Sequence, residues 1–250
     1  MFKFFRNIRQ SLLTENKMGK YFKYAIGEIL LVVIGILIAL QINNWNENRN
    51  ARNEEQEILK ALKTEISENQ IILTKDLKRH SSVLRLLTEL SDYIDPEPQI
   101  ISNKRLDSLM FSLGWLPTYY PKEGVLNSIL TSGKISLIKS KQLNSKLASW
   151  HSLLNRYNMT LSWSEKDVFD LILPYLKDNY PLKRTLKLFG SENIKKSKFK
   201  FSPEAILSDM EFETIVAERI IDASDALGSA EKLFSYQAEV IALIENELKK

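Results

Sequence analysis

An unbroken apolar run near the N-terminus constrains this chain more than any other feature. Between residues 24 and 42, the strongly polar side chains are those of Glu28 and Gln41. These roughly 19 residues would form about 28 Å of α-helix, which matches the hydrocarbon thickness of a bilayer. Such a composition is too apolar for a helix exposed to water. The run therefore predicts one transmembrane helix over residues 21–43.

The charges on the two sides of this run predict its orientation. Residues 1–23 carry six Lys and Arg residues against one acid, Glu15, whereas residues 43–60 mix basic and acidic side chains. Because positively charged flanks stay in the cytoplasm, we expect the N-terminus there and the large domain outside. The exit from the run lacks a small-x-small cleavage site, which favours a retained signal anchor over a cleaved signal peptide.

Two further features concern the membrane itself. Residues 1–20 alternate apolar with basic side chains, so a helix there could lie in the inner-leaflet interface, either to steady the anchor or to contact a cytoplasmic partner. Within the predicted span, small residues on one face would let two helix backbones approach closely. Glu28 either reaches the headgroups or contacts a partner helix. The candidate transmembrane contact face is Gly27, Glu28, Gly35 and Ala39.

The remaining residues, 44–250, have the pattern of an all-α domain. Gly (8) and Pro (7) are scarce, and residues 43–93 contain neither. Apolar residues recur there at intervals of three, four or seven, with a shift of phase near Leu77, and Asn69 and His80 fall on or beside this stripe. We therefore expect one long helix, packed against the last helix of the chain in a helical bundle outside the cytoplasm.

Shorter helices and one basic segment complete the predicted domain. The helices cover Asn103–Leu113, Lys122–Thr131, Ser140–Tyr157, Ser164–Leu176, and a final stretch from Ser202 or Ser208 towards Lys250. Gly133 should end the second of these in the left-handed conformation. Residues 182–202 form a basic linker. Its cations have three possible roles: contact with anionic headgroups or an acidic polymer, pairing with the acidic last helix, or simple solvation.

An aromatic loop is the candidate surface for a protein partner. Trp115, Tyr119 and Tyr120 lie close together between two predicted helices. Trp and Tyr bury a large area with little loss of entropy, so they are favoured at interfaces. The alternative is that the loop only caps one end of the bundle.

The sequence predicts no metal site and no cofactor. The chain has no Cys, and its two histidines, His80 and His151, belong to no metal-binding motif. Acidic residues share one face of the last helix at Glu218, Asp222 and Asp225, which solvation explains better than a carboxylate metal site. His80 is expected to be a buried polar residue rather than a pH sensor.

No catalytic residue is predicted either. The tripeptide Ser132-Gly133-Lys134 lacks the upstream Gly and the following Ser or Thr of a phosphate loop. The pair Ser136 and Lys139 matches S-x-x-K without the companion elements of that motif. We therefore expect that the protein is not an enzyme.

Four stretches resemble a known family. They are Phe4–Leu13, Tyr24–Asn46, Ser128–Ile138 and Ile244–Leu248, and they are similar to a family of uncharacterised membrane proteins of Bacteroidota labelled DUF6090. The resemblance implies a single-pass protein of the inner membrane of a Gram-negative cell, with a helical domain in the periplasm. It implies no activity, ligand or catalytic residue. Asp107-Ser108-Leu109 also looks like an O-glycosylation acceptor of that bacterial group, which makes Ser108 a candidate modification site.

These patterns favour a non-catalytic, membrane-tethered helical scaffold or interaction protein of the cell envelope. Its expected partners are the lipid bilayer and either a second copy or an envelope protein, and nucleic acid is not expected. Two alternatives remain open: a ligand-sensing bundle that acts through a partner, and an unrecognised envelope enzyme.

Overall fold

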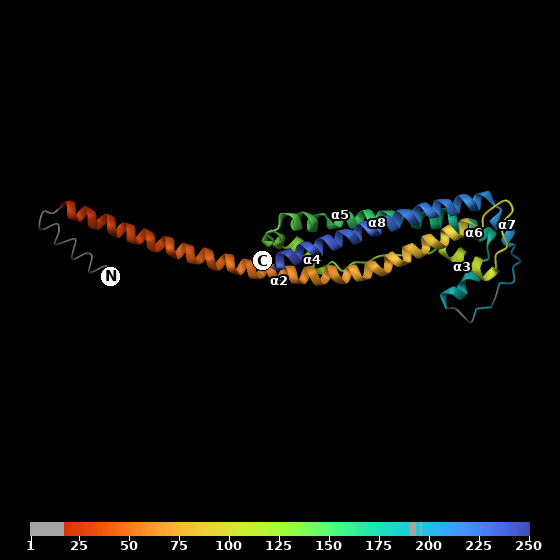
Figure 1. The fold of residues 1–250 in the computed structure, drawn as a ribbon, viewed down its shortest axis with the longest axis horizontal. Coiled ribbons are helices and arrows are strands. Elements are labelled where there is room, and N and C mark those ends of the chain that lie inside the picture. The colour runs from red at the N-terminus through yellow and green to blue at the C-terminus, as the bar shows by residue number, and fades with distance from the viewer. Residues whose placement is uncertain (1–17, 191–193, 196) are drawn as a thin grey trace. The chain divides into compact units, whose positions relative to one another are not determined.

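A computed structural model describes residues 18–190, 194–195 and 197–250 (Figure 1). Most of the predicted cytoplasmic segment, residues 1–17, lies outside the described part. The described residues form helices and loops, with no β-strand among them, which confirms the predicted all-α class. The chain divides into two compact units between Glu57 and Ile58.

Helix α2 (Met18–Ser91) is continuous and contributes to both units. Its part in the first unit contains a segment that is long and apolar enough to cross a membrane. The large apolar side chains of this segment, such as Ile34 and Leu37, are exposed along its length, as they would be on a helix that faces lipid. The helix ends at Ser91, shortly before Pro96, which has no N–H to continue a helix.

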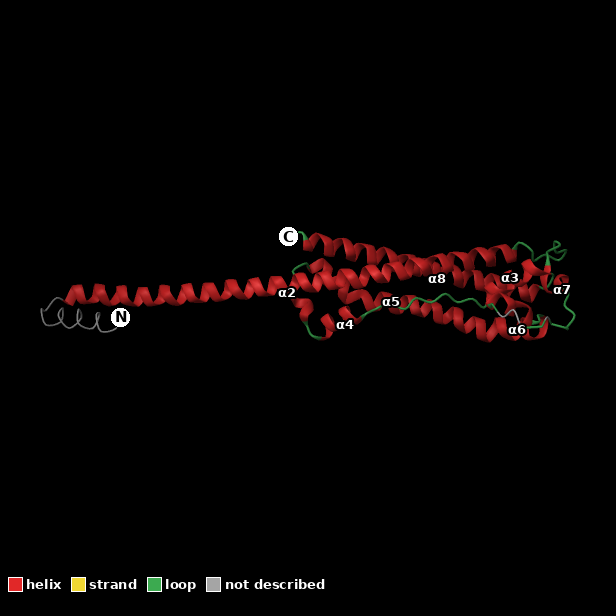
Figure 2. Ribbon diagram, turned by 90° about the horizontal axis from the view of Figure 1, so that it is seen from below, coloured by secondary structure: helices red, strands yellow, loops and turns green. Residues whose placement is uncertain are grey.

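Three long helices run side by side in the second unit: α2 from Ile58 onward, α5 (Lys141–Asp167) and α8 (Met210–Leu248) (Figures 1 and 2). An ion pair of 2.8 Å between Lys63 Nζ and Glu245 Oε1 joins α2 to α8. The two helices also share both apolar clusters of the core. The predicted packing of the first long helix against the last is therefore confirmed.

The core of the second unit consists of two apolar clusters. One is built around Leu62, Leu147 and Leu233, and the other around Leu87 and Val216. Along α2 the two clusters are separated by polar residues, Asp76 and His80, which are buried. The change from one cluster to the other coincides with the shift of phase in the sequence pattern.

The predicted break between residues 158 and 163 is wrong, because α5 continues through it to Asp167. The polar residues there fit inside a helix, since the hydroxyls of Thr160 and Ser162 donate to the carbonyls of Tyr157 (2.7 Å) and Asn158 (3.1 Å). A π-helical turn, η2 (Val168–Ile172), then leads into α6 (Leu173–Asn179). This wider turn accommodates Pro174, which has no N–H to donate.

The shorter elements follow the predicted order. They are α3 (Asn103–Leu113), α4 (Gly124–Thr131), the 3₁₀ turns η1 (Lys134–Leu137) and η3 (Leu182–Phe189), and α7 (Pro203–Leu207). Gly133 has a φ of 73°, which confirms its predicted left-handed conformation. Of the two predicted starts of the final helix, the second is confirmed, since Asp209 caps α8, whereas Ser202 caps the separate short helix α7. Part of the predicted linker at 182–202 is helical, because η3 lies within it.

Candidate functional site

An extended segment, residues 114–123, connects α3 to α4 and is called the strap here. Buried side chains of the long helices hold its two ends. The guanidinium of Arg219 on α8 donates to the carbonyls of Leu113 (3.1 Å) and Trp115 (3.0 Å). The amide of Asn69 on α2 accepts from the N–H of Lys122 and donates to its carbonyl, both at 2.7 Å. The strap is therefore an integral part of the fold.

The start of α4, just after the strap, is also bound by α2. The carboxylate of Glu65 accepts from the N–H groups of Val125 (2.7 Å) and Leu126 (3.0 Å). These are N–H groups of the first helical turn, which have no partner within a helix. Glu65 thus serves as a cap supplied from a distant part of the sequence.

The structure divides the predicted partner-contact loop. Tyr119 is 2% exposed, and its hydroxyl accepts a hydrogen bond of 2.8 Å from Nε2 of Gln237. In this fold it is a core residue and offers no surface to a partner, which corrects the expectation. Trp115 packs, half-buried, against the core cluster around Leu87. Tyr120 is 79% exposed and remains as the candidate contact residue.

His80 is a buried residue of the core. Its Nε2 lies 3.0 Å from the hydroxyl of Tyr157, within hydrogen-bond distance. Burial and the positive charge of Arg219 lower the pKa of His80 to about 4, so the imidazole is neutral at pH 7. This agrees with its predicted role as a buried polar residue.

A charged group lies inside the bundle where α8 meets α5. Arg219 is 2% exposed, and burial lowers the pKa of its guanidinium. Asp222, one turn along α8, is half-buried, and burial together with the nearby charge of Asp167 raises its pKa to about 6. Glu218 and Asp225 are exposed. The predicted solvated acidic face is therefore wrong for Asp222. Among the described residues, no cluster of three or more His, Asp or Glu side chains has an arrangement that could hold a metal ion.

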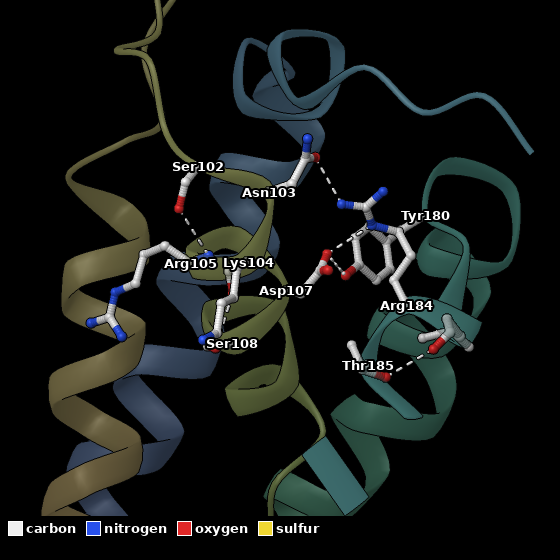
Figure 3. A network of polar contacts seen from close by, with 10 residues as sticks. Ser102, Asn103, Lys104, Arg105, Asp107, Ser108, Tyr180, Arg184 and Thr185 are labelled. Carbon is white, nitrogen blue, oxygen red and sulfur yellow. Dashed lines mark hydrogen bonds and ion pairs between the residues drawn. The ribbon is translucent and has the colours of Figure 1, made fainter. Parts of the chain in front are cut away.

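A second polar network joins α3 to the basic linker (Figure 3). Oδ1 of Asp107 accepts hydrogen bonds of 2.7 Å from the Tyr180 hydroxyl and from Nε of Arg184. Nη2 of Arg184 also donates to Oδ1 of Asn103 at 2.7 Å. Burial and the Asp107 carboxylate raise the pKa of Tyr180. Arg184 thus pairs with α3, whereas pairing with the last helix was one of the open alternatives for the linker.

Ser108 lies on α3 beside this network. Its hydroxyl donates to the carbonyl of Lys104 at 3.0 Å, and its side chain is half-buried. The neighbours in the candidate acceptor tripeptide have roles in the fold, since Asp107 binds Arg184 and Leu109 is buried. The tripeptide therefore belongs to a packed helix.

Two hollows flank the same network. One measures about 720 Å³ and lies against the end of α6, the start of η3, residue 195 and residues 197–200. The other measures about 570 Å³ and is lined by Asn103, Asp107 and Arg184 among others. By contrast, a hollow between α2, α5 and α8, beside Glu65 and Gln237, measures about 10 Å³. That volume admits no ligand larger than a water molecule.

The candidate transmembrane face lies on α2 in the first unit. Gly27, Gly35 and Ala39 are exposed along it, and Glu28 is half-buried. A Cβ atom placed on Gly27 or Gly35 would meet no other atom within 4 Å. The face is thus open to a second helix, and its role in helix association stays a prediction.

Comparison with known proteins gives one match. A family model described as a family of unknown function, DUF6090, matches residues 28–200. The matched region begins inside the apolar segment of α2 and extends into the basic linker, as far as residue 200. No curated protein and no solved structure matches the chain.

Proposed function

The chain belongs to the DUF6090 family, whose function is unknown, and we propose that it is a non-catalytic scaffold of a bacterial cell envelope. In this proposal α2 crosses the inner membrane once, with the N-terminus in the cytoplasm and the second unit in the periplasm. The scaffold binds an envelope protein or a second copy of itself. The charge difference between residues 1–23 and 43–60 supports the orientation.

The continuity of α2 carries this proposal. One helix supplies both the apolar segment that is long enough to cross a membrane and a row of core residues of the second unit, such as Leu59, Leu73 and Leu87. The tether is therefore itself an element of the packed domain. This is the organisation expected of a protein that holds an interaction surface at a membrane.

The use of the buried polar side chains also supports a structural role. Arg219 and Asn69 bind the backbone of the strap, Glu65 caps α4, and Gln237 binds Tyr119. Each of these side chains makes a hydrogen bond that holds the fold together, which favours a structural role for them over substrate binding. The 10 Å³ hollow among the long helices also argues against a ligand-sensing bundle.

Purification of the tagged protein from native-host membranes in mild detergent tests the proposal. Quantitative mass spectrometry and mass photometry would give the partners and the oligomeric state. A stoichiometric envelope protein or a defined homo-oligomer is the expected result. A monomer with no stoichiometric partner would contradict the scaffold role.

The absence of Cys from the sequence allows a clean test of topology. Two variants are made, each with one cysteine. In one variant the cysteine replaces Ser11, in the N-terminal segment, and in the other it replaces Ser224, which is exposed on α8. A membrane-impermeant maleimide applied to spheroplasts should label Ser224→Cys and should label Ser11→Cys only after the membrane is opened. The reverse pattern would show that the domain faces the cytoplasm, and labelling of both in intact spheroplasts would show that the membrane is leaky.

A further inference from the structure

The larger hollow is lined by an excess of positive charge. Its lining includes five lysines and one carboxylate, that of Asp178. The lysines are Lys177, Lys183, Lys195, Lys198 and Lys200. The second hollow shares Lys183 and Lys195 with the first and adds Lys104 and Arg184. The two hollows therefore form one basic surface, which we call the basic end.

The charges of the basic end are not balanced within the described part of the chain. Arg184 is neutralised by Asp107 at 2.7 Å. No ion pair with a described carboxylate occurs at Lys183, Lys195 or Lys198. Because like charges held close together repel, a cluster of this kind is stabilised when an anion binds to it.

Apolar side chains are exposed among these lysines. Phe199 stands between Lys198 and Lys200 in the sequence and is 84% exposed. Leu182 lines the larger hollow, Leu188 lines the smaller one, and both are exposed. Cations that alternate with exposed Phe and Leu are typical of surfaces that bind in the headgroup region of a membrane. A soluble anion would make no use of the apolar groups.

The basic end occupies one extremity of the second unit. It lies with α3, α6 and α7, at the end where α2 stops at Ser91 (Figure 1). About 50 Å of helix separates Ser91 from Ile58, where α2 enters this unit. The basic end is therefore far, within the unit, from the point at which the chain arrives from its apolar segment.

We propose that the basic end binds the phosphate groups of an anionic lipid surface. Lys183, Lys195 and Lys198 contact the phosphates, and Phe199 lies at the boundary between headgroups and acyl chains. This binding site goes beyond the proposed scaffold function, because it needs no protein partner. The lipid belongs either to the membrane that holds α2 or to a second membrane.

Vesicle capture by the full-length protein tests the proposal. The protein is placed in phosphatidylcholine nanodiscs and floated with separate vesicles of phosphatidylcholine mixed with phosphatidylglycerol. Capture is expected on these vesicles and not on pure phosphatidylcholine, and it should weaken as salt is raised. Each lysine near an anionic surface strengthens binding roughly fivefold, so the triple variant Lys183→Gln/Lys195→Gln/Lys198→Gln should bind about a hundredfold more weakly.

A matched variant keeps the total charge change the same. Lys75, Lys78 and Lys166 are exposed elsewhere on the helical unit, and their replacement by Gln should leave capture unchanged. The basic N-terminal segment is present in every variant, so it does not affect the comparison. Phe199→Ser should weaken capture severalfold. The helix content should not change, because the Phe199 side chain is exposed and does not support the fold. Circular dichroism confirms that each variant is folded.

The outcomes show which membrane supplies the lipid, and they distinguish lipid binding from non-specific charge effects and from other phosphate ligands. If capture persists when the nanodisc is also anionic, the site binds a second membrane. If the anionic nanodisc abolishes it, the site binds the protein's own membrane, and either result supports the proposal. Equal weakening by the two triple variants would overturn it, since any surface charge would then suffice. Binding of inorganic polyphosphate or of a phosphopeptide without vesicle capture would also overturn it.

Discussion

Replacing Arg219 by methionine is expected to lower the free energy of unfolding by about 3–5 kcal/mol. Arg219 is buried, and its guanidinium donates to two carbonyls at the start of the strap, that of Leu113 at the end of α3 and that of Trp115. Methionine fills a similar volume but leaves both carbonyls without this donor. It also removes the positive charge that faces Asp167 and Asp222. Thermal unfolding of the full-length protein in detergent, followed by circular dichroism, should show a midpoint lower by about 10 °C.

Arg85→Met is the matched control for this prediction. Arg85 lies on α2 with 67% of its side chain exposed, and its ion pair with Glu89 is long, at 4.0 Å. Its replacement should change the free energy of unfolding by less than about 0.5 kcal/mol. The loss of stability in Arg219→Lys should lie between those of Arg219→Met and Arg85→Met, because one ammonium group cannot reproduce the bidentate contact of a guanidinium. Equal stability of the Arg219 and Arg85 variants would show that Arg219 does not hold the strap.

The sequence predicts the long helices well because their information is local. The absence of Gly and Pro from residues 43–93 and a regular apolar stripe are sufficient to predict α2 as one helix. The start and end of α3 are likewise determined by neighbouring residues: Ser102 caps the first turn with its side chain, and Gly114 follows the last turn. Where prediction failed, at residues 158–163, the polar composition was misleading, because hydroxyls bonded within the helix compensate for it.

The strap shows what local patterns cannot reveal. A short segment rich in Pro and aromatic residues has the composition of a surface loop, yet Tyr119 is buried. Its hydrogen-bond partner, Gln237, is 118 residues away in the sequence. The other end of the strap depends on Arg219, which is likewise remote from it. Only the packed arrangement of α2 and α8 brings these partners to the strap.

One signal in the sequence did mark the buried charges. Ile215, Arg219 and Ala223 follow one another at intervals of four, so Arg219 occupies a position where an apolar residue is expected. A charged residue at such a position requires buried partners. Its acidic neighbours on the same helix face predict that Asp222 faces solvent, but its environment depends on α5, which supplies Asp167.

Asp222→Asn is expected to stabilise the protein by about 2 kcal/mol above pH 7. Burial and the charge of Asp167 raise the pKa of Asp222 to about 6, and Arg219 opposes this shift only in part. A carboxyl with a raised pKa binds its proton more tightly in the folded state. Its ionisation therefore reduces stability as pH rises from about 4 to about 6. Asparagine cannot ionise, so the variant escapes this loss.

The pH dependence of the difference between variant and native protein makes the test specific. His80 has the opposite effect, because its pKa is lowered to about 4 in the folded state. Its contribution reduces the stability of the protein as pH falls below about 6.5. Because both proteins contain His80, its contribution cancels in the difference. The variant's advantage should be full above pH 7 and vanish below about pH 4. The exposed neighbour gives the control, since Asp225→Asn should shift stability by less than about 0.5 kcal/mol at every pH. A constant difference across this range would show that Asp222 keeps an ordinary pKa, and that the charged group between α5 and α8 is better solvated than its burial indicates.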